Sequence, residues 1–284
     1  MLEMILNPRR SEKRPWEMFF VGFIYASVSI LMVQWIFSKD AVLAPYSGIL
    51  VVTFTVMCCI PYVYYSMKLE ESKDTKIENS FKLLEEHGKA IHSFLWLFIG
   101  LIVAFSVMYI VIGSTNNYKA QIETYCAINN PYNYKSCTIE HGVVTGQVTG
   151  ATTEGSMFGG IFTNNLYVLI FTIIFSIIFG AGGIFVLAWN ASVISAAMVI
   201  FAKQDLSLLP LSLVRYMFHG LPEIAAYFIG TLAGGIIGIS IIKKEYKNER
   251  FWSIIYDTLL LIISAIVILL IAALMEVFIT PRFF

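Results

Sequence analysis

The sequence predicts an all-α polytopic membrane protein, a bundle of about six to seven transmembrane helices. Hydrophobic residues make up 58% of the 284 residues and charged residues only 13%, whereas soluble proteins carry about 25% charged residues. Mean hydropathy is correspondingly high, at +0.75. Apolar runs near the roughly 20 residues that a helix needs to cross a bilayer recur along the chain. Because backbone groups in lipid must bond within the protein, these runs are expected to be helices.

The N-terminal membrane region, residues 1–113, contains three predicted spans. They cover 16–37, 41–65 and 94–112. In 67–93, apolar residues recur at helical spacing among lysines and glutamates, which predicts a cytoplasmic amphipathic helix lying on the membrane or on a partner. The residues that set this spacing are Ile77, Phe81, Leu84 and Ile91.

A polar loop, residues 114–160, follows the third span and is predicted to lie outside the cytoplasm. Its roughly 45 residues exceed the usual loop length, and loops of that size are either functional or disordered. Cys126 and Cys137 both fall in it. Because an extracytoplasmic compartment permits oxidation, we expect these two cysteines to form a disulfide.

A glycine-rich core, residues 161–242, follows the loop. Its first predicted span runs from 161 to 189, and the next apolar run covers only 191–201, which is short for a crossing. We therefore expect a short or re-entrant segment near 191–210 before the next span, at 216–242.

The C-terminal region, residues 243–284, adds a charged turn and the last predicted span, 251–278. Lysines and arginines gather before the first span, in 67–93 and in the 243–250 turn, so the positive-inside rule places all three in the cytoplasm. The chain is thus predicted to be a multi-pass protein of the cell membrane with a cytoplasmic N-terminus and lipid around it. Formal net charge is zero, which gives no indication of a nucleic-acid partner.

Glycines spaced by four mark the last span of the core. Gly230, Gly234 and Gly238 would give that helix a flat face, and Gly180 and Gly183 could supply a complementary surface. Small residues at this interval let two helix backbones approach closely. Two interpretations stay open: a specific contact between subunits, and ordinary packing within one bundle.

Five polar residues interrupt the apolar core: Asn164, Asn165, Asn190, His219 and Glu223. A polar group without a partner at membrane depth costs several kcal/mol, roughly 2–7, so such groups face a bundle interior or a cavity. Three hypotheses stay open for His219 and Glu223, which share one helix face. They could tether a helix end, line a polar cavity or ion path with the asparagines, or bind a metal, although two ligands make a poor metal site.

No motif of an enzyme is present. The chain contains no GxSxG, HExxH, P-loop or dinucleotide fingerprint, and each of these would bring its chemistry in a recognisable spacing. We therefore expect no catalytic residues, no cofactor and no metal.

The core also resembles a known family. The matching segments, in order, are Phe162-Thr163-Asn164-Asn165, Gly180-Ala181-Gly182-Gly183, Trp189-Asn190 and Phe218-His219-Gly220-Leu221-Pro222-Glu223-Ile224. From Met157 to Ile242 the chain resembles the stage II sporulation protein M family of integral membrane proteins. The residues that match the family's signature positions are Asn164, Asn165, Asn190, His219, Gly220 and Glu223. The family's namesake is a membrane scaffold that anchors peptidoglycan-degrading partners during spore formation.

Together these observations predict a non-enzymatic membrane scaffold. We expect it to form a homodimer or higher oligomer through its glycine-rich helix faces and to organise envelope or membrane-remodelling partners. The alternative is a channel or transporter in which broken helices carry the five polar residues around a polar path. The two differ in whether those side chains face only one another or a cavity that reaches the surface.

Overall fold

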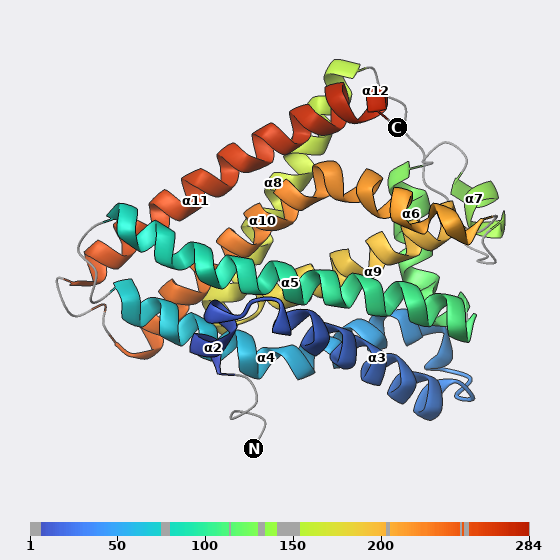
Figure 1. Ribbon diagram of the computed structural model, residues 1–284, viewed down its shortest axis with the longest axis horizontal. Coiled ribbons are helices and arrows are strands. Elements are labelled where there is room, and N and C mark those ends of the chain that lie inside the picture. The colour runs from blue at the N-terminus through green and yellow to red at the C-terminus, as the bar shows by residue number, and fades with distance from the viewer. Residues whose placement is uncertain are drawn as a thin grey trace.

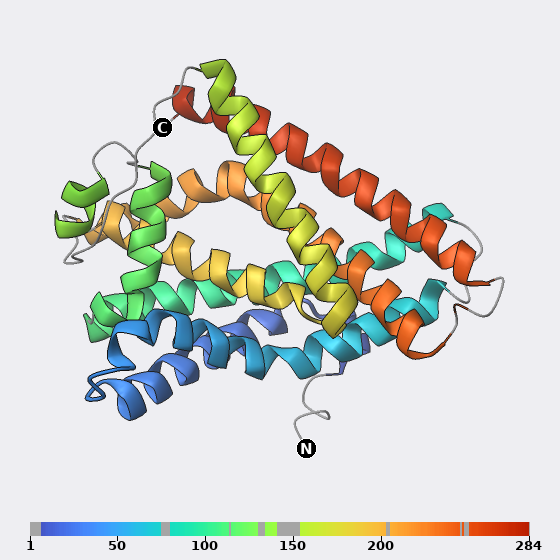
Figure 2. The same cartoon turned by 180° about the vertical axis from the view of Figure 1, so that it is seen from behind.

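The computed structural model is built from helices (Figures 1 and 2). It describes residues 7–74, 80–113, 115–129, 134–140, 154–202, 205–244, 246 and 250–283. Within these ranges there is no β-strand. The predicted all-α class is confirmed.

Within these described ranges, seven helices are long and apolar enough to cross a membrane, which confirms the predicted polytopic bundle. They are α3 (Glu17–Phe37), α4 (Ser47–Asp74), α5 (Ser80–Ile112), α8 (Glu154–Phe179), α9 (Gly183–Phe201), α10 (Leu209–Ile242) and α11 (Arg250–Leu274). Large apolar side chains such as Trp35, Val111 and Trp252 are exposed on them. Lipid would cover such side chains in a bilayer.

The helices form two groups that meet in the middle of the molecule. α3 packs along α5, and α5 packs along α9, while α10 lies among α8, α9 and α11 (Figures 1 and 2). The α3–α5 crossing is close because both helices carry a glycine there. A Cβ on Gly22 would lie 2.3 Å from the Leu97 carbonyl oxygen, and a Cβ on Gly100 would lie 2.1 Å from that of Phe19.

The boundary between α8 and α9 differs from the sequence prediction. The apolar stretch predicted to be one span over 161–189 contains a turn, in which Gly180 has a φ of +70°, a conformation that only glycine adopts at little cost. The short segment expected near 191–210 is therefore not a separate element, because residues 191–201 are the second half of α9. With 19 residues, α9 is about 28 Å long, enough for most of a bilayer core.

Helix α10 begins before the predicted span and changes direction (Figure 1). A single 3-10 turn, η4 (Leu206–Leu208), leads into it. Pro222 stands inside α10, and an internal proline removes one backbone hydrogen bond and bends a helix. Residues 209–215, which precede the span predicted over 216–242, are thus continuous with the transmembrane part of α10.

The amphipathic helix predicted over 67–93 is not a separate element. Its described residues form the last turns of α4 and the first turns of α5, and residues 75–79 lie outside the described ranges. Glu70, Glu71 and His87 are buried in this part of the molecule. These three side chains face neighbouring helices, while Lys68 and Lys89 are exposed, and the contact of this segment with the membrane or with a partner stays a prediction.

The predicted loop after α5 is partly helical. Its described part contains η2 (Thr115–Tyr118), α6 (Lys119–Asn129) and α7 (Tyr134–Glu140), which we call the cap. We call the end of the bundle that carries the cap the cap end. The opposite end, which holds the C-termini of α4 and α10, is the charged end. Three further short elements are η1 (Ala44–Tyr46), α2 (Pro8–Lys13) and α12 (Thr280–Phe283).

Candidate functional site

A cavity of about 380 Å³ opens among α6, α8, α9, α10 and the end of the last helix. We call it the polar cavity. Asn164, Asn165, Asn190 and Glu223, four of the five polar residues singled out in the sequence, line it. The fifth, His219, lies on α10 next to the lining residue Gly220, but its side chain is outside the described part of the structure.

Helix α10 supplies one wall of the polar cavity through a stripe of residues three or four positions apart. The stripe consists of Tyr216, Gly220, Glu223, Ile224 and Tyr227. Residues at this spacing lie one above another on a helix. Gly220 removes a side chain from the middle of the stripe, and a Cβ there would meet only Met217 Cε, 3.9 Å away, so the glycine leaves room beside Glu223.

Helix α8 brings the two asparagines to the opposite wall. Asn165 Nδ2 donates a hydrogen bond of 2.7 Å to Glu223 Oε1, and Asn164 Nδ2 lies 3.4 Å from Asn165 Oδ1. Asn190, from α9, donates through Nδ2 to the carbonyl of Val186 at 2.8 Å. The amides therefore join α8 to α10 and line the cavity at the same time.

A second carboxyl group completes the site. Glu276 lines the cavity from the π-helical turn η6 (Met275–Ile279), so two carboxyl groups, Glu223 and Glu276, share the same space. Single π-helical turns interrupt α-helices frequently at functional sites. Sequence analysis placed Glu276 in the last span but not in this site.

None of the described side chains that line the polar cavity is positively charged. No lysine, arginine or described histidine side chain is among its lining residues. Within the described residues, no three histidine, cysteine, aspartate or glutamate side chains gather as they would around a metal ion. Its chemistry is that of two carboxyl groups, three amides and three tyrosines, Tyr125, Tyr216 and Tyr227.

Comparison with known proteins identifies the family. The family model described as "Stage II sporulation protein M" matches residues 18–281, nearly the whole chain. The chain belongs to the stage II sporulation protein M family. No match was found among curated proteins or among solved structures. The predicted resemblance is confirmed, and it extends well beyond the core from which it was inferred.

The glycine faces of this family member are filled by its own helices. A Cβ on Gly234 would lie 2.5 Å from the Ile173 carbonyl oxygen, and one on Gly238 would lie 2.5 Å from that of Ile177. Gly230 meets Leu169, so all three face α8, while Gly183 meets Thr231 of α10. Of the two interpretations left open, the geometry corresponds to packing within one bundle.

Buried polar side chains attach the cap to the bundle. The cap also contains the two cysteines that were predicted to form a disulfide. The structure joins Cys126 of α6 to Cys137 of α7 in a disulfide. Gln121 Nε2 donates to the carbonyl of Gly48 at 2.9 Å and lies 3.2 Å from Ser192 Oγ. Tyr118 donates through its hydroxyl to the carbonyl of Phe105 at 2.7 Å. These contacts hold the cap against α4, α5 and α9.

A network of charges at the charged end was not foreseen from the sequence. Lys73 Nζ lies 2.9 Å from Glu12, 2.8 Å from Glu70 and 3.7 Å from Glu86. His87 Nδ1 lies 2.8 Å from the other oxygen of Glu70. Burial and the neighbouring carboxyl group of Glu70 raise the pKa of Glu12 to about 7. Residues from α2, α4 and α5 are thus tied together around one ammonium group.

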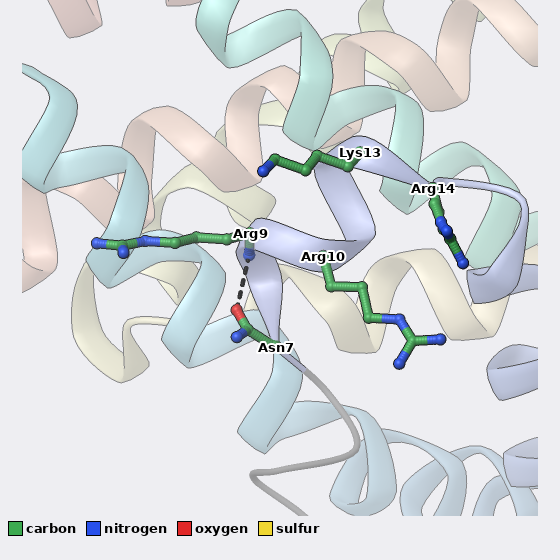
Figure 3. A pocket seen from close by; sticks show the side chains of 5 residues that line it. All are labelled: Asn7, Arg9, Arg10, Lys13 and Arg14. Carbon is green, nitrogen blue, oxygen red and sulfur yellow. Dashed lines mark hydrogen bonds between the residues drawn. The ribbon is translucent and has the colours of Figure 1, made fainter.

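A second concavity, of about 500 Å³, surrounds α2 near the N-terminus. Asn7, Arg9, Arg10, Lys13 and Arg14 line it. Figure 3 shows the side chains of Arg9 and Arg14 pointing away from each other, while Asn7 Oδ1 accepts from the Arg9 backbone N–H at 3.0 Å. Arg10 pairs with Glu17 at 2.8 Å. These basic groups spread over a surface rather than converge on one ligand.

Proposed function

We propose that this protein is a non-enzymatic membrane scaffold whose cap presents a fixed surface to envelope or membrane-remodelling partners. The observation that carries the proposal is the attachment of the cap by Tyr118 and Gln121, both nearly inaccessible to solvent. A surface that is already ordered binds a partner without the entropy loss that ordering a loop would add. Membership of the stage II sporulation protein M family supports this role.

The proposed orientation has the charged end in the cytoplasm and the cap outside. The basic residues around α2 support it, because lysines and arginines are retained on the cytoplasmic side. A disulfide in the cap supports it too, since disulfides persist outside the reducing cytosol.

Assembly with a second copy is also part of the proposal, but through other faces than the glycines. The glycines of α10 already contact α8. Exposed apolar side chains on α3 and α11, such as Phe20 and Val267, remain available for lipid or for another copy. The mass of the protein in lipid nanodiscs tests this: a single-copy mass at all concentrations would contradict oligomerisation.

Photo-crosslinking in living cells tests the scaffold. A photoreactive residue replaces Lys135 or Ser136, both exposed in the cap, and the matched control carries it at Val267, which is exposed on α11. We expect adducts to specific envelope proteins from the cap positions only. Adducts that are identical for the cap and the α11 position would contradict a cap-based scaffold.

Transport is the second candidate, and the polar cavity favours it. Against a complete path stands the extent of that cavity: its lining on α10 ends at Tyr227. Beyond that residue the glycine-spaced part of α10 is closed by α8, with backbone approaching backbone at Gly234 and Gly238. Among the described residues, the cavity therefore has the shape of a binding pocket that stops inside the bundle.

A further inference from the structure

The polar cavity adjoins an apolar groove on the outside of the bundle. The groove has a volume of about 620 Å³ and lies between α8 and α9. Four residues line both spaces: Asn164, Val168, Asn190 and Val193. The two asparagines therefore stand at the junction between a polar space and an apolar one.

The groove is built for hydrocarbon. Its walls carry Tyr167, Phe171, Phe185 and Trp189, and Tyr167 and Phe171 are 69% and 48% exposed. Exposed apolar side chains on a membrane-spanning helix face lipid. The groove is therefore accessible from the bilayer and not only from water.

The lining residues of the two spaces follow one another along both helices. On α8 the lining residue found only in the cavity, Gly160, precedes those of the groove, Tyr167 and Phe171. On α9, Phe185 lines the groove and Ala197 lines the cavity. A polar wall therefore adjoins an apolar one on each helix, as the headgroup of a lipid adjoins its chain. The distance along α8 from Gly160 to Phe171 is about 16 Å.

The charge of the cavity selects the headgroup. Glu223 and Glu276 both line the cavity, and none of its described lining side chains is cationic, so the two carboxyl groups favour a positively charged ligand. The ring of a tyrosine attracts an ammonium group to its face, and Tyr125, Tyr216 and Tyr227 line the same space. A volume of about 380 Å³ is at the small end of ligand pockets, which range from about 300 to 1,000 Å³.

We propose that the polar cavity and the adjoining groove bind one membrane lipid with an ammonium headgroup. The ammonium group lies between Glu223 and Glu276, and the hydrocarbon chain lies along Tyr167 and Phe171 between α8 and α9. The site goes beyond the proposed scaffold and does not depend on it, because neither the cap surface nor its partners enter the argument.

Native mass spectrometry of the purified protein tests the site without any substitution. Phosphatidylethanolamine and phosphatidylglycerol with the same acyl chains are added in equal amounts, and soluble ethanolamine is added alone. We expect retained phosphatidylethanolamine at least tenfold in excess of phosphatidylglycerol, and no retained ethanolamine. Equal retention of the two lipids would overturn the role of the carboxyl pair, and tight binding of ethanolamine alone would overturn the role of the groove.

Two sets of variants locate the bound lipid. Replacing both carboxyl groups, Glu223→Gln with Glu276→Gln, should lower phosphatidylethanolamine retention at least tenfold, whereas Glu85→Gln, an exposed glutamate at the charged end, should not change it. Phe171→Ala should lower retention several-fold, and the matched Phe20→Ala, also exposed but on α3, should not. Unchanged retention in the folded double variant would overturn the proposal. Each variant is first shown to melt as cooperatively as the wild type.

Discussion

Two groups of enclosed carboxyl side chains lie at different depths of this membrane protein, and their surroundings are opposite. At the charged end, Glu12 and Glu70 both pair with Lys73, and Glu70 also pairs with His87. In the polar cavity, Asn165 donates a hydrogen bond to Glu223, and none of the described side chains that line the cavity with Glu223 and Glu276 is cationic. The first group stabilises the fold, because its carboxyl groups are paired with a cation. The second group has no paired cation among the described residues and is available to bind a ligand. A buried carboxylate indicates a site only when its neighbours leave it partly uncompensated.

The largest expected effect comes from removing the shared cation. Lys73→Met keeps the apolar stem but leaves the carboxylates of Glu12 and Glu70 enclosed without a cation. Breaking a buried ion pair from one side costs about 3–5 kcal/mol, and we expect a loss of that order in thermal or denaturant unfolding. Lys89→Met is the control, because Lys89 is 46% exposed and exposed pairs contribute less than about 1 kcal/mol. Similar losses of stability in the two variants would contradict the distinction between the enclosed ion-pair network and an exposed ion pair.

The next-largest effect tests a close contact between two helices that involves no charged side chain. Gly100→Ala places a Cβ 2.1 Å from the Phe19 carbonyl oxygen, so the α3–α5 crossing must open, at about 1–3 kcal/mol. Gly88→Ala is on the same helix and meets nothing within 4 Å. It should raise stability by up to about 1 kcal/mol. Melting temperatures that shift in the same direction for both would contradict the packing assigned to α3 and α5.

Much of this fold follows from hydrophobic length alone. The seven crossings were predictable because each needs a long apolar stretch. The α8–α9 hairpin was not, because its turn at Gly180 lies inside continuous apolar sequence and no polar residue marks it. Likewise, the apolar residues of 67–93 show a helical period, but the sequence does not reveal which neighbours the glutamates and lysines among them face.

The candidate site was predictable only in part for a similar reason. Asn164, Asn165, Asn190 and Glu223 stood out because amides and carboxylates are costly in lipid. Glu276 lies 53 positions beyond Glu223, and only the packing of α11 and its π-helical turn bring the two together. Nor does the sequence reveal the apolar groove, because its aromatic residues look like any other lipid-facing side chains.

A smaller effect tests the hydrogen bond between α8 and α10. Glu223→Ala removes the acceptor of the 2.7 Å bond from Asn165, while Glu223→Gln can keep it. A buried polar group that loses its partner costs about 1–3 kcal/mol, so the alanine variant should melt at a lower temperature than the glutamine variant. Equal melting temperatures would show that the amide partners of Glu223 contribute nothing to the fold.

The smallest expected effect is a pH dependence at the charged end. Glu12 faces Glu70 and Lys73, and its pKa is raised from 4.5 to about 7 by burial and by Glu70. A raised pKa stabilises the folded protein below the ordinary value and loses that contribution as the pH rises through about 7. The wild type should therefore lose more stability than Glu12→Gln between those pH values. Parallel melting curves against pH for the two proteins would contradict the shift.

The central claim is that the polar cavity ends inside the bundle and binds rather than conducts. Flux of small ions and solutes into proteoliposomes tests it most directly, with the wild type compared with a variant that combines Glu223→Gln and His219→Ala. We expect no flux above that of protein-free vesicles from either folded protein. Flux that the wild type supports and the variant loses would contradict the claim and show that the cavity opens into a path across the membrane.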